Sequence, residues 1–348
     1  MPAKRTPARR PTMKDIARRA GVSESAVSFA LNGRPGVSET TRARVQRVAE
    51  QLGWRPNTAA RALSGEGAAT VGFVLARPAH TLGVDSFFLQ LVSGIQEVLA
   101  ERHLGLLFQV VEDIGDECAV YRRWWAEHRV DGVLVVDPRS EDPRPGLLNE
   151  LGLPAVLIGG APDEGHQGLS TVWADDAGAM ASVVDELTAL GHRRIVHIAG
   201  LPDLAHTRRR IRALRAEAER RGLGEVESVT TDYSDTEAAA VTRRVLDSAA
   251  APTALVYDND VMAVAGVAAA SELGFSVPAD LSVVAWEDSA LCRIVKPWLS
   301  ALSRDSVEFG STAARELLAL LDGGPARTVR VPVPRLIERD STAVVRAG

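Results

Sequence analysis

The residues that decide the fold of the N-terminal part are 13–63, which read MKDIARRAGVSESAVSFALNGRPGVSETTRARVQRVAEQLGWRPNTAARAL. Thr12 and Asp15 have the spacing of a helix capping box. Gly21 predicts the end of that helix because glycine adopts a positive φ without strain, and Ser23 is suited to cap a second helix. Apolar residues recur at helical spacing through the rest of the stretch. The pattern predicts three short helices with a tight turn between the first two, as in a helix-turn-helix unit.

Charge is distributed unevenly along the 348 residues. Residues 1–65 hold 13 lysines and arginines but only 4 acidic residues, a net charge of +9. The whole chain carries −5, which leaves −14 on the other 283 residues. A basic head on an acidic body indicates a polyanionic partner for the head. The alternative, a solvated basic tail, is opposed by the helix signals in the same residues.

Strand-like and helical stretches alternate beyond Thr70. The strand-like runs are TVGFVL (70–75), GLLFQV (105–110), GVLVV (132–136), PAVLI (154–158), RIVHI (194–198), VESVT (226–230), TALVY (253–257) and LSVVAW (281–286). Repeated strand–helix units predict parallel sheets with helices on both faces. The units are numerous enough for two sheets.

Several classes of protein do not fit this sequence. No apolar run reaches the roughly 18 residues that cross a bilayer, and the basic, proline-rich N-terminus lacks the apolar stretch of a signal peptide. Two cysteines, Cys118 and Cys292, fit a reducing cytoplasm and exclude a cysteine-based zinc site. The glycines form no phosphate loop or nucleophile elbow. Asp258 and Asp260 end a strand, as catalytic acids do, but no histidine stands near them in sequence. We therefore expect no enzyme, cofactor or metal.

The stretch quoted above resembles the head of the lactose-repressor/galactose-repressor (LacI/GalR) family of bacterial transcription regulators. The shared order is D-[IV]-A…A-G-V-S…V-S…L-N…V-S…T-R…L-G-[YW]-x-P-N…A-R-x-L, which is far more specific than a lone helix-turn-helix pattern. The likeness covers nearly the whole chain beyond Pro11. It implies a small all-α helix-turn-helix head and an α/β body with two doubly wound parallel-sheet lobes, similar to periplasmic sugar-binding proteins and connected by three crossings.

In that family the second helix of the head enters the major groove of DNA. The resemblance places Glu24, Ser25 and Phe29 where base edges are read. It places phosphate contacts at Ser23, Ser28, Asn32 and Arg34. Phe29 can touch a thymine methyl group or pack against the protein, but it cannot bind guanine in the bidentate way of the arginine common at that place. Glu24 can accept a hydrogen bond from cytosine or cap the helix.

Residues 55–63 resemble the hinge segment of the family. About two helical turns are too short to be stable alone in water, and in the family this segment folds on DNA as paired helices from two subunits. The resemblance assigns minor-groove contacts to Asn57, Ala60, Arg61 and Leu63. Leu63 matches the wedge that kinks the duplex; the alternative is an ordinary linker residue.

The resemblance also places a small ligand, expected to be a sugar, between the lobes at the carboxyl ends of the strands. The candidate effector-binding residues are Phe88, Trp173, Asp175, Arg210, Tyr233, Asn259 and Glu287. Asp176 shares a strand end with Asp175, and Asp260 is expected to cap the helix that follows Asn259. Phe88 is either a stacking face for the sugar or a core residue of its helix. Glu287 stands where the family has a shorter aspartate.

These observations predict a DNA-binding transcription regulator, expected to be a repressor, that binds a palindromic double-stranded operator as a homodimer or tetramer and responds to a small effector. We expect it in the bacterial cytoplasm, with the nucleoid and not with a membrane. The rival is a stand-alone solute-binding protein without a DNA role. The expected parts are a basic arm (1–11), a helix-turn-helix domain (12–55), a hinge and linker (56–68), and an effector-binding and dimerisation body (69–348) with one lobe at about 69–171 and 301–326 and the other at about 172–300 and 327–348.

Overall fold

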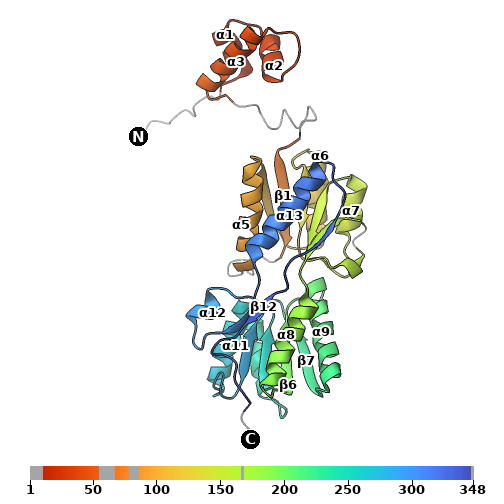
Figure 1. The fold of residues 1–348 in the computed structure, drawn as a ribbon, viewed down its shortest axis with the longest axis vertical. Helices are drawn as coiled ribbons and strands as arrows, with labels where there is room; N and C mark the ends of the chain where they lie inside the picture. The colour runs from red at the N-terminus through yellow and green to blue at the C-terminus, as the bar shows by residue number, and fades with distance from the viewer. Residues whose placement is uncertain (1–10, 55–66, 78–85, 166–167, 346–348) are drawn as a thin grey trace. The chain divides into compact units, whose positions relative to one another are not determined.

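The computed structural model describes residues 11–54, 67–77, 86–165 and 168–345. The chain divides at Gly67 into two compact units, the head and the body. The head consists of the helices α1 (Met13–Ala20), α2 (Glu24–Leu31) and α3 (Glu39–Gln51) (Figure 1). Their apolar faces enclose a small core that is formed by Ile16, Ala17, Ala20, Val27, Ala30, Val45, Val48 and Ala49.

The turn chemistry of the head follows the sequence pattern. The Asp15 carboxylate accepts a hydrogen bond of 2.9 Å from the Thr12 N–H, and Thr12 Oγ1 accepts one of 3.4 Å from the Asp15 N–H. Gly21 has a φ of 66° and ends α1. The predicted capping box and the helix-turn-helix arrangement are therefore confirmed.

The first lobe of the body contains a six-stranded sheet with the order β11–β5–β4–β3–β1–β2, and its neighbouring strands are all parallel. The strands are β1 (Thr70–Ala76), β2 (Gly105–Val111), β3 (Gly132–Val135), β4 (Ala155–Ile158), β5 (Ser170–Trp173) and β11 (Thr328–Arg330). One face packs on α5 (Ser86–Glu101) and α13 (Ser306–Leu321), and the other on α6 (Ile114–Ala126) and α7 (Arg144–Leu151). A short 3-10 helix, Pro162–Glu164, follows β4.

Two glycines allow α5 and α13 to approach each other closely. A Cβ atom on Gly94 would lie 1.9 Å from the carbonyl oxygen of Val307, and one on Gly310 would lie 2.1 Å from the carbonyl oxygen of Leu91. No real Cβ atom tolerates such distances, so this helix pair depends on both glycines.

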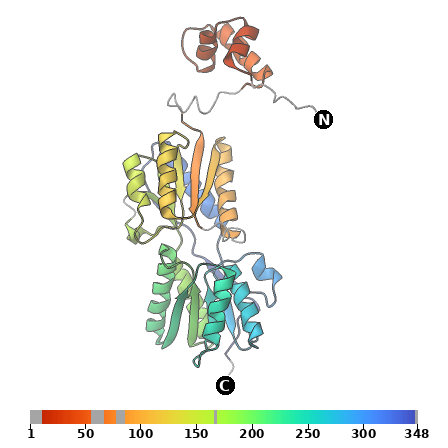
Figure 2. The ribbon, with the colours of Figure 1, turned by 180° about the vertical axis from the view of Figure 1, so that it is seen from behind.

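The second lobe repeats the architecture with the strand order β12–β10–β9–β8–β6–β7. The strands are β6 (Arg194–Ala199), β7 (Glu225–Thr230), β8 (Ala254–Tyr257), β9 (Ser282–Ala285), β10 (Ser300–Ser303) and β12 (Arg335–Ile337), and only the β10–β12 pair is antiparallel among those described. The helices are α8 (Asp176–Ala189) and α9 (Ala205–Arg221) on one face, and α10 (Asp235–Leu246), α11 (Asp260–Glu272) and the short α12 (Leu291–Ile294) on the other. Figure 2 shows both lobes from behind.

The chain crosses between the lobes three times, as predicted: from β5 to α8, from β10 to α13, and from β11 to β12. The expected lobe boundaries shift by a few residues. β5 extends to Trp173 in the first lobe, β10 begins at Ser300 in the second, and β11 (328–330) belongs to the first. The edge strand β11 has only three residues, of which only Val329 is partly buried, so it has no apolar run that a sequence pattern could detect.

Candidate functional site

The exposed face of α2 is the candidate DNA-reading surface of the head. Glu24 and Ser25 lie in the first turn and are exposed. Phe29 lies one turn further on, with 37% of its surface exposed, and one edge of its ring packs on Gly36, where a Cβ atom would lie 3.2 Å from the ring. The ring is partly held by the protein and partly open, so base contact and packing both remain physically reasonable for Phe29.

The expected phosphate-contact residues lie along the same helix. Ser23 is the N-cap of α2, and its Oγ accepts a hydrogen bond of 3.2 Å from the Ala26 N–H. Asn32 ends the helix and donates from Nδ2 to Ser28 Oγ at 3.4 Å. Arg34 follows in the turn and is exposed. These side chains border the reading face, which is where phosphate contacts would fix the register.

Arg42 of α3 holds the end of α2 in place. Its guanidinium donates hydrogen bonds of 3.0 Å to the carbonyl oxygens of Ala30 and Arg34. These carbonyls lack partners within the helix, so the arginine satisfies them and fixes the turn. Sequence reasoning missed this role because the partners stand 8 and 12 residues away with no helical spacing. The hinge residues Asn57, Ala60, Arg61 and Leu63 lie outside the described residues.

The body contains a cavity of about 70 Å³ where the carboxyl ends of the two sheets meet. Five of the seven expected effector-binding residues line it: Phe88, Arg210, Tyr233, Asn259 and Glu287. Asp176 and Asp258 also line it. Sequence reasoning did not assign to this site Arg77, Asp137, His206, Arg209, Arg304 and Phe309. Arg77 and Asp137 directly follow strands that the sequence predicted, so the position of the strand ends could have identified them. The other four lie on α9, on α13 or on the crossing from β10 to α13, where the ends of the predicted strands give no signal.

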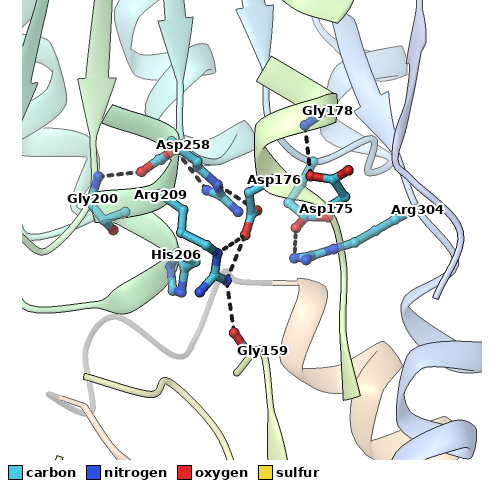
Figure 3. Close-up of polar contacts among 12 residues, drawn as sticks. Gly159, Asp175, Asp176, Gly178, Gly200, His206, Arg209, Asp258 and Arg304 are labelled. Carbon is cyan, nitrogen blue, oxygen red and sulfur yellow. Dashed lines mark hydrogen bonds and ion pairs between the residues drawn. The ribbon is translucent and has the colours of Figure 1, made fainter. Parts of the chain in front are cut away.

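Arg210 lies at the centre of a buried charge cluster. Its Nη1 donates to Asp258 Oδ1 at 2.8 Å, and its Nε donates to Asp176 Oδ1 at 3.2 Å. Burial alone would raise the pKa of the Asp258 carboxyl, but the charge of Arg210 beside it holds that pKa far below its usual range. The Gly200 N–H donates to the same carboxylate at 2.8 Å (Figure 3). Asp258 is therefore a permanent anion inside the protein.

Arg209 extends the cluster from the second lobe into the first (Figure 3). It donates to Asp176 at 2.8 Å, to the carbonyl oxygen of Gly159 at 2.9 Å and to Glu164 at 2.6 Å. Gly159 and Glu164 both follow β4 of the first lobe. Arg209 is 9% exposed, although it stands in a run of arginines whose members Arg208 and Arg212 are exposed. The N–H groups of its planar guanidinium therefore donate hydrogen bonds to residues of both lobes.

Arg77 makes a second connection between the lobes. It follows β1, and its Nε donates to Asp137 at 2.6 Å. The guanidinium lies 5.0 Å from the ring centre of Phe88 in the first lobe and 4.9 Å from that of Tyr233 in the second. Phe88 is 7% exposed and belongs to the core of its lobe while it also faces the cavity. Phe88 is thus a core residue of its helix and is also placed where a sugar could stack on its ring.

His206 is a neutral member of the cavity wall. Its Nε2 lies 2.8 Å from the hydroxyl oxygen of Tyr233. Burial and the nearby charge of Arg210 lower the pKa of His206 to about 3. The imidazole therefore adds hydrogen-bonding capacity to the site near neutral pH without adding charge.

Glu287 forms an ion pair with Arg304, which lies on the crossing from β10 to α13. The Arg304 guanidinium lies 4.2 Å from the ring centre of Phe87 and 5.8 Å from that of Phe309. The longer reach of glutamate than of aspartate allows this pairing. Glu287 therefore enters the cavity with its charge already compensated.

Trp173 and Asp175 are not among the residues that line the cavity. The Trp173 ring lies under the guanidinium of Arg330 at 5.4 Å, and Asp175 pairs with the same arginine at 2.6 Å. Asp175 is the N-cap of α8, where its Oδ1 accepts a hydrogen bond from the Gly178 N–H at 2.9 Å (Figure 3). Asp176 lines the cavity in place of Asp175, because capping directs the Asp175 carboxylate to the end of the helix.

Asn259 lines the cavity as expected, but the helix cap expected at Asp260 needs a correction. Asn259 both lines the cavity and caps α11, since its Oδ1 accepts a hydrogen bond of 2.8 Å from the Met262 N–H. Asp260 is not the cap: it occupies the first helical position, is 2% exposed, and burial raises its pKa. An asparagine in extended backbone is as good a cap as aspartate, so residue type alone could not separate them.

A histidine does contact Asp258, although none is close in sequence. His197 Nε2 lies 3.0 Å from Asp258 Oδ1, and His197 Nδ1 lies 3.3 Å from Ser228 Oγ. The order of groups resembles a hydrolytic triad. However, His197 is fully buried, neither it nor Ser228 lines the cavity, and Arg210 also neutralises Asp258. The three side chains therefore connect β6, β7 and β8 within the sheet.

Two structural absences apply to the described residues. No group of three or more histidine, cysteine, aspartate or glutamate side chains in this part of the chain is placed to hold a metal ion. Within residues 11–54, 67–77, 86–165 and 168–345, the helices lack the combination of length and hydrophobicity that a transmembrane span needs.

Comparisons with known proteins match both units. Residues 12–57 match the model for bacterial regulatory proteins of the lacI family, and residues 184–342 match the periplasmic binding protein-like domain. The HTH-type transcriptional regulator CelR of Thermobifida fusca is 31% identical over 93% of this chain and 95% of its own length.

Solved structures agree with these matches. A LacI family transcriptional regulator from Bifidobacterium animalis subsp. lactis is 34% identical over 80% of this chain and 99% of that one, with a TM-score of 0.73. The complex of the transcriptional regulator CelR with cellobiose is 28% identical over 95% of this chain and 100% of that one, also with a TM-score of 0.73. The match over residues 12–57 excludes the rival without a DNA role. The chain belongs to the lacI family of bacterial regulatory proteins and is a DNA-binding transcriptional regulator, not an enzyme.

Proposed function

We propose that this regulator binds a palindromic operator as a homodimer and represses transcription there, and that a neutral, polyhydroxylated ligand of the sugar class sets its operator affinity from the cavity. One head reads one half-site, so a two-fold dimer is needed to read a palindrome. The +9 charge of residues 1–65 and the exposed face of α2 support the DNA role. The setting is the bacterial cytoplasm and nucleoid, which two buried free cysteines also fit.

The charge balance of the cavity is the observation that carries the ligand class. Its lining includes four arginines and four carboxylates, and each of the arginines contacts at least one carboxylate. A charged ligand would have to break such pairs without replacement, whereas hydroxyl groups can donate to carboxylates and accept from guanidinium groups. The rings of Phe88 and Tyr233 supply apolar faces on which a sugar can lie.

The cavity is smaller than a typical ligand site. Its volume of about 70 Å³ compares with roughly 300 to 1,000 Å³ for sites that hold small molecules. Ligand entry therefore requires Arg77, Arg209 and neighbouring side chains to move, and those side chains also connect the lobes. Binding is thus coupled to the relative position of the lobes, which is what a switch requires.

The test combines a ligand screen with DNA binding. The full-length protein is screened by thermal shift against neutral mono- and disaccharides, sugar phosphates and nucleobases, with Glu287→Gln as the cavity variant and exposed Glu272→Gln as control. We expect a neutral sugar to stabilise the wild type and the control, and to bind about tenfold more weakly to Glu287→Gln. Stabilisation by sugar phosphates or nucleobases alone would contradict the ligand class. Affinity for promoter fragments that does not fall with salt would contradict the DNA role.

A further inference from the structure

A second hollow lies beside the lobe boundary, separate from the cavity. Its volume is about 500 Å³, within the range of small-molecule sites. Four arginines line it, Arg139, Arg208, Arg212 and Arg215, and Glu164 is the one acidic residue among its lining. None of the four arginines lines the central cavity. We name this hollow the arginine groove.

Three of these arginines lie on one face of α9. Arg208, Arg212 and Arg215 are spaced four and three residues apart, so they follow one another along the helix over about 10 Å. All three are exposed, and within the described part of the chain none of them has a carboxylate partner. Like charges at this spacing repel one another. A row of three uncompensated cations is therefore unfavourable unless an anion neutralises it.

The acidic side chain of the groove does not supply that neutralisation. Glu164 already pairs with Arg209, which points into the central cavity region, at 2.6 Å. Arg139 has a partner in Asp203 at 3.5 Å. The body carries a net charge of −14 outside residues 1–65, and most of its described arginines have ion-pair partners. The concentration of unpaired positive charge in the arginine groove is an exception to that pattern.

Both lobes contribute to the groove. Arg139 and Glu164 belong to the first lobe, and α9 belongs to the second. The lobes touch at this point: the Ala205 N–H donates to the Pro138 carbonyl oxygen at 2.8 Å, and Arg139 forms an isolated β-bridge with Leu204. An anion held by arginines of both lobes would therefore stabilise the arrangement of the lobes seen here.

We propose that the arginine groove binds a small phosphate-bearing metabolite, and that this ligand acts on the lobes independently of the central cavity. Guanidinium groups bind phosphate oxygens in bidentate fashion, and three of them along α9 suit a ligand with two phosphate groups or a pyrophosphate. The N-terminal turn of α9, which has no side-chain cap, adds positive potential at the Ala205 end of the groove. A hollow of about 500 Å³ fits a small molecule better than an extended nucleic acid.

Inorganic pyrophosphate is the probe that tests this site. Its binding to the full-length protein is measured by calorimetry and by thermal shift, with sodium chloride added to the reference to match ionic strength. The groove variant is Arg208→Gln/Arg212→Gln, and Arg215→Gln alone is the milder form. The matched control is Arg122→Gln/Arg244→Gln, which removes two exposed arginines of the body outside the groove. All of these side chains are on the surface, so the variants should fold.

We expect saturable binding to the wild type and the control, a weakening of about tenfold or more in the double groove variant, and a smaller weakening in Arg215→Gln. Pyrophosphate should also raise the melting temperature of the wild type. Absence of saturable binding would overturn the proposal. Equal binding by the groove variant would place the anion elsewhere, most simply on the basic head, and would also overturn it. A groove variant that keeps pyrophosphate binding but loses affinity for duplex DNA would make the groove a nucleic-acid surface instead.

Discussion

Nη2 of Arg209 donates a hydrogen bond of 2.9 Å to the main-chain carbonyl oxygen of Gly159, which lies in the other lobe (Figure 3). The same guanidinium binds Glu164 of the first lobe and Asp176 of the second. The lobes are thus held together by contacts of the protein itself. A ligand that enters the cavity must replace some of these contacts. Its binding therefore changes the relative stability of different lobe arrangements.

Arg210 is needed for the stability of the second lobe. Removing a buried arginine that neutralises two carboxylates leaves Asp176 and Asp258 less compensated, a change that typically costs about 3–5 kcal/mol. We expect Arg210→Ala to lower the free energy of unfolding by that order in urea titrations. Arg212→Ala, exposed on the same helix, is the control and should change it by less than about 0.5 kcal/mol. Equal effects of the two substitutions would show that the buried pairs contribute nothing.

The lowered pKa of His206 predicts a pH dependence of stability. The unfolded state takes up a proton near pH 6.5, whereas folded His206 stays neutral until about pH 3. The free energy of unfolding therefore has its full His206 contribution above pH 6.5. Below pH 6.5 this contribution decreases, by about 2 kcal/mol at pH 5. We expect His206→Gln to remove that part of the decrease in urea titrations between pH 7.5 and 5. If the free energy of unfolding of the variant decreased with falling pH as steeply as that of the wild type, His206 would have to be protonated in the folded protein.

The glycines between α5 and α13 give a prediction for the first lobe. Gly94→Ala places a methyl group against the Val307 carbonyl oxygen, so the helices must separate. Overpacking of this kind costs about 1–3 kcal/mol. Gly224→Ala, where a Cβ atom would meet nothing within 4 Å, is the control and should be neutral or slightly stabilising. A Gly94 variant as stable as this control would contradict the close packing.

Leu63 remains a prediction of the family resemblance. If it wedges into the operator, Leu63→Ala should weaken specific operator binding by about 1–3 kcal/mol and leave non-specific binding nearly unchanged. Circular-permutation assays should also show a smaller DNA bend with the variant. The same bend with wild type and variant would rule out the wedge.

The sequence predicted most of the architecture because helix caps and apolar runs are local signals. Thr12 and Asp15 predicted the start of the first helix, and the family resemblance predicted Arg210, Tyr233, Asn259 and Glu287 as residues of the ligand site. The predictions that were wrong or missing concern which of two neighbouring residues caps a helix, or contacts between residues far apart in the sequence. Which of Asp175 and Asp176, or of Asn259 and Asp260, caps a helix is decided by backbone conformation.

The residues that the sequence missed reach the cavity from outside the periodic pattern. Arg77 and Arg304 follow strands, and their partners Asp137 and Glu287 follow two other strands, 60 and 17 residues away. No spacing rule connects such pairs before the topology is known. The same applies to the small size of the cavity, which results from how these side chains pack across the two lobes.

The proposed switch requires that ligand binding in the cavity and operator binding by the head affect each other, and reciprocal titration measures this coupling. Operator affinity is measured by fluorescence anisotropy with and without the sugar that stabilises the protein, and sugar affinity is measured by calorimetry with and without operator. We expect each ligand to change the affinity of the other by the same factor, about 5- to 150-fold, which corresponds to about 1–3 kcal/mol. A sugar that binds the cavity and leaves operator affinity unchanged would contradict the proposed switch.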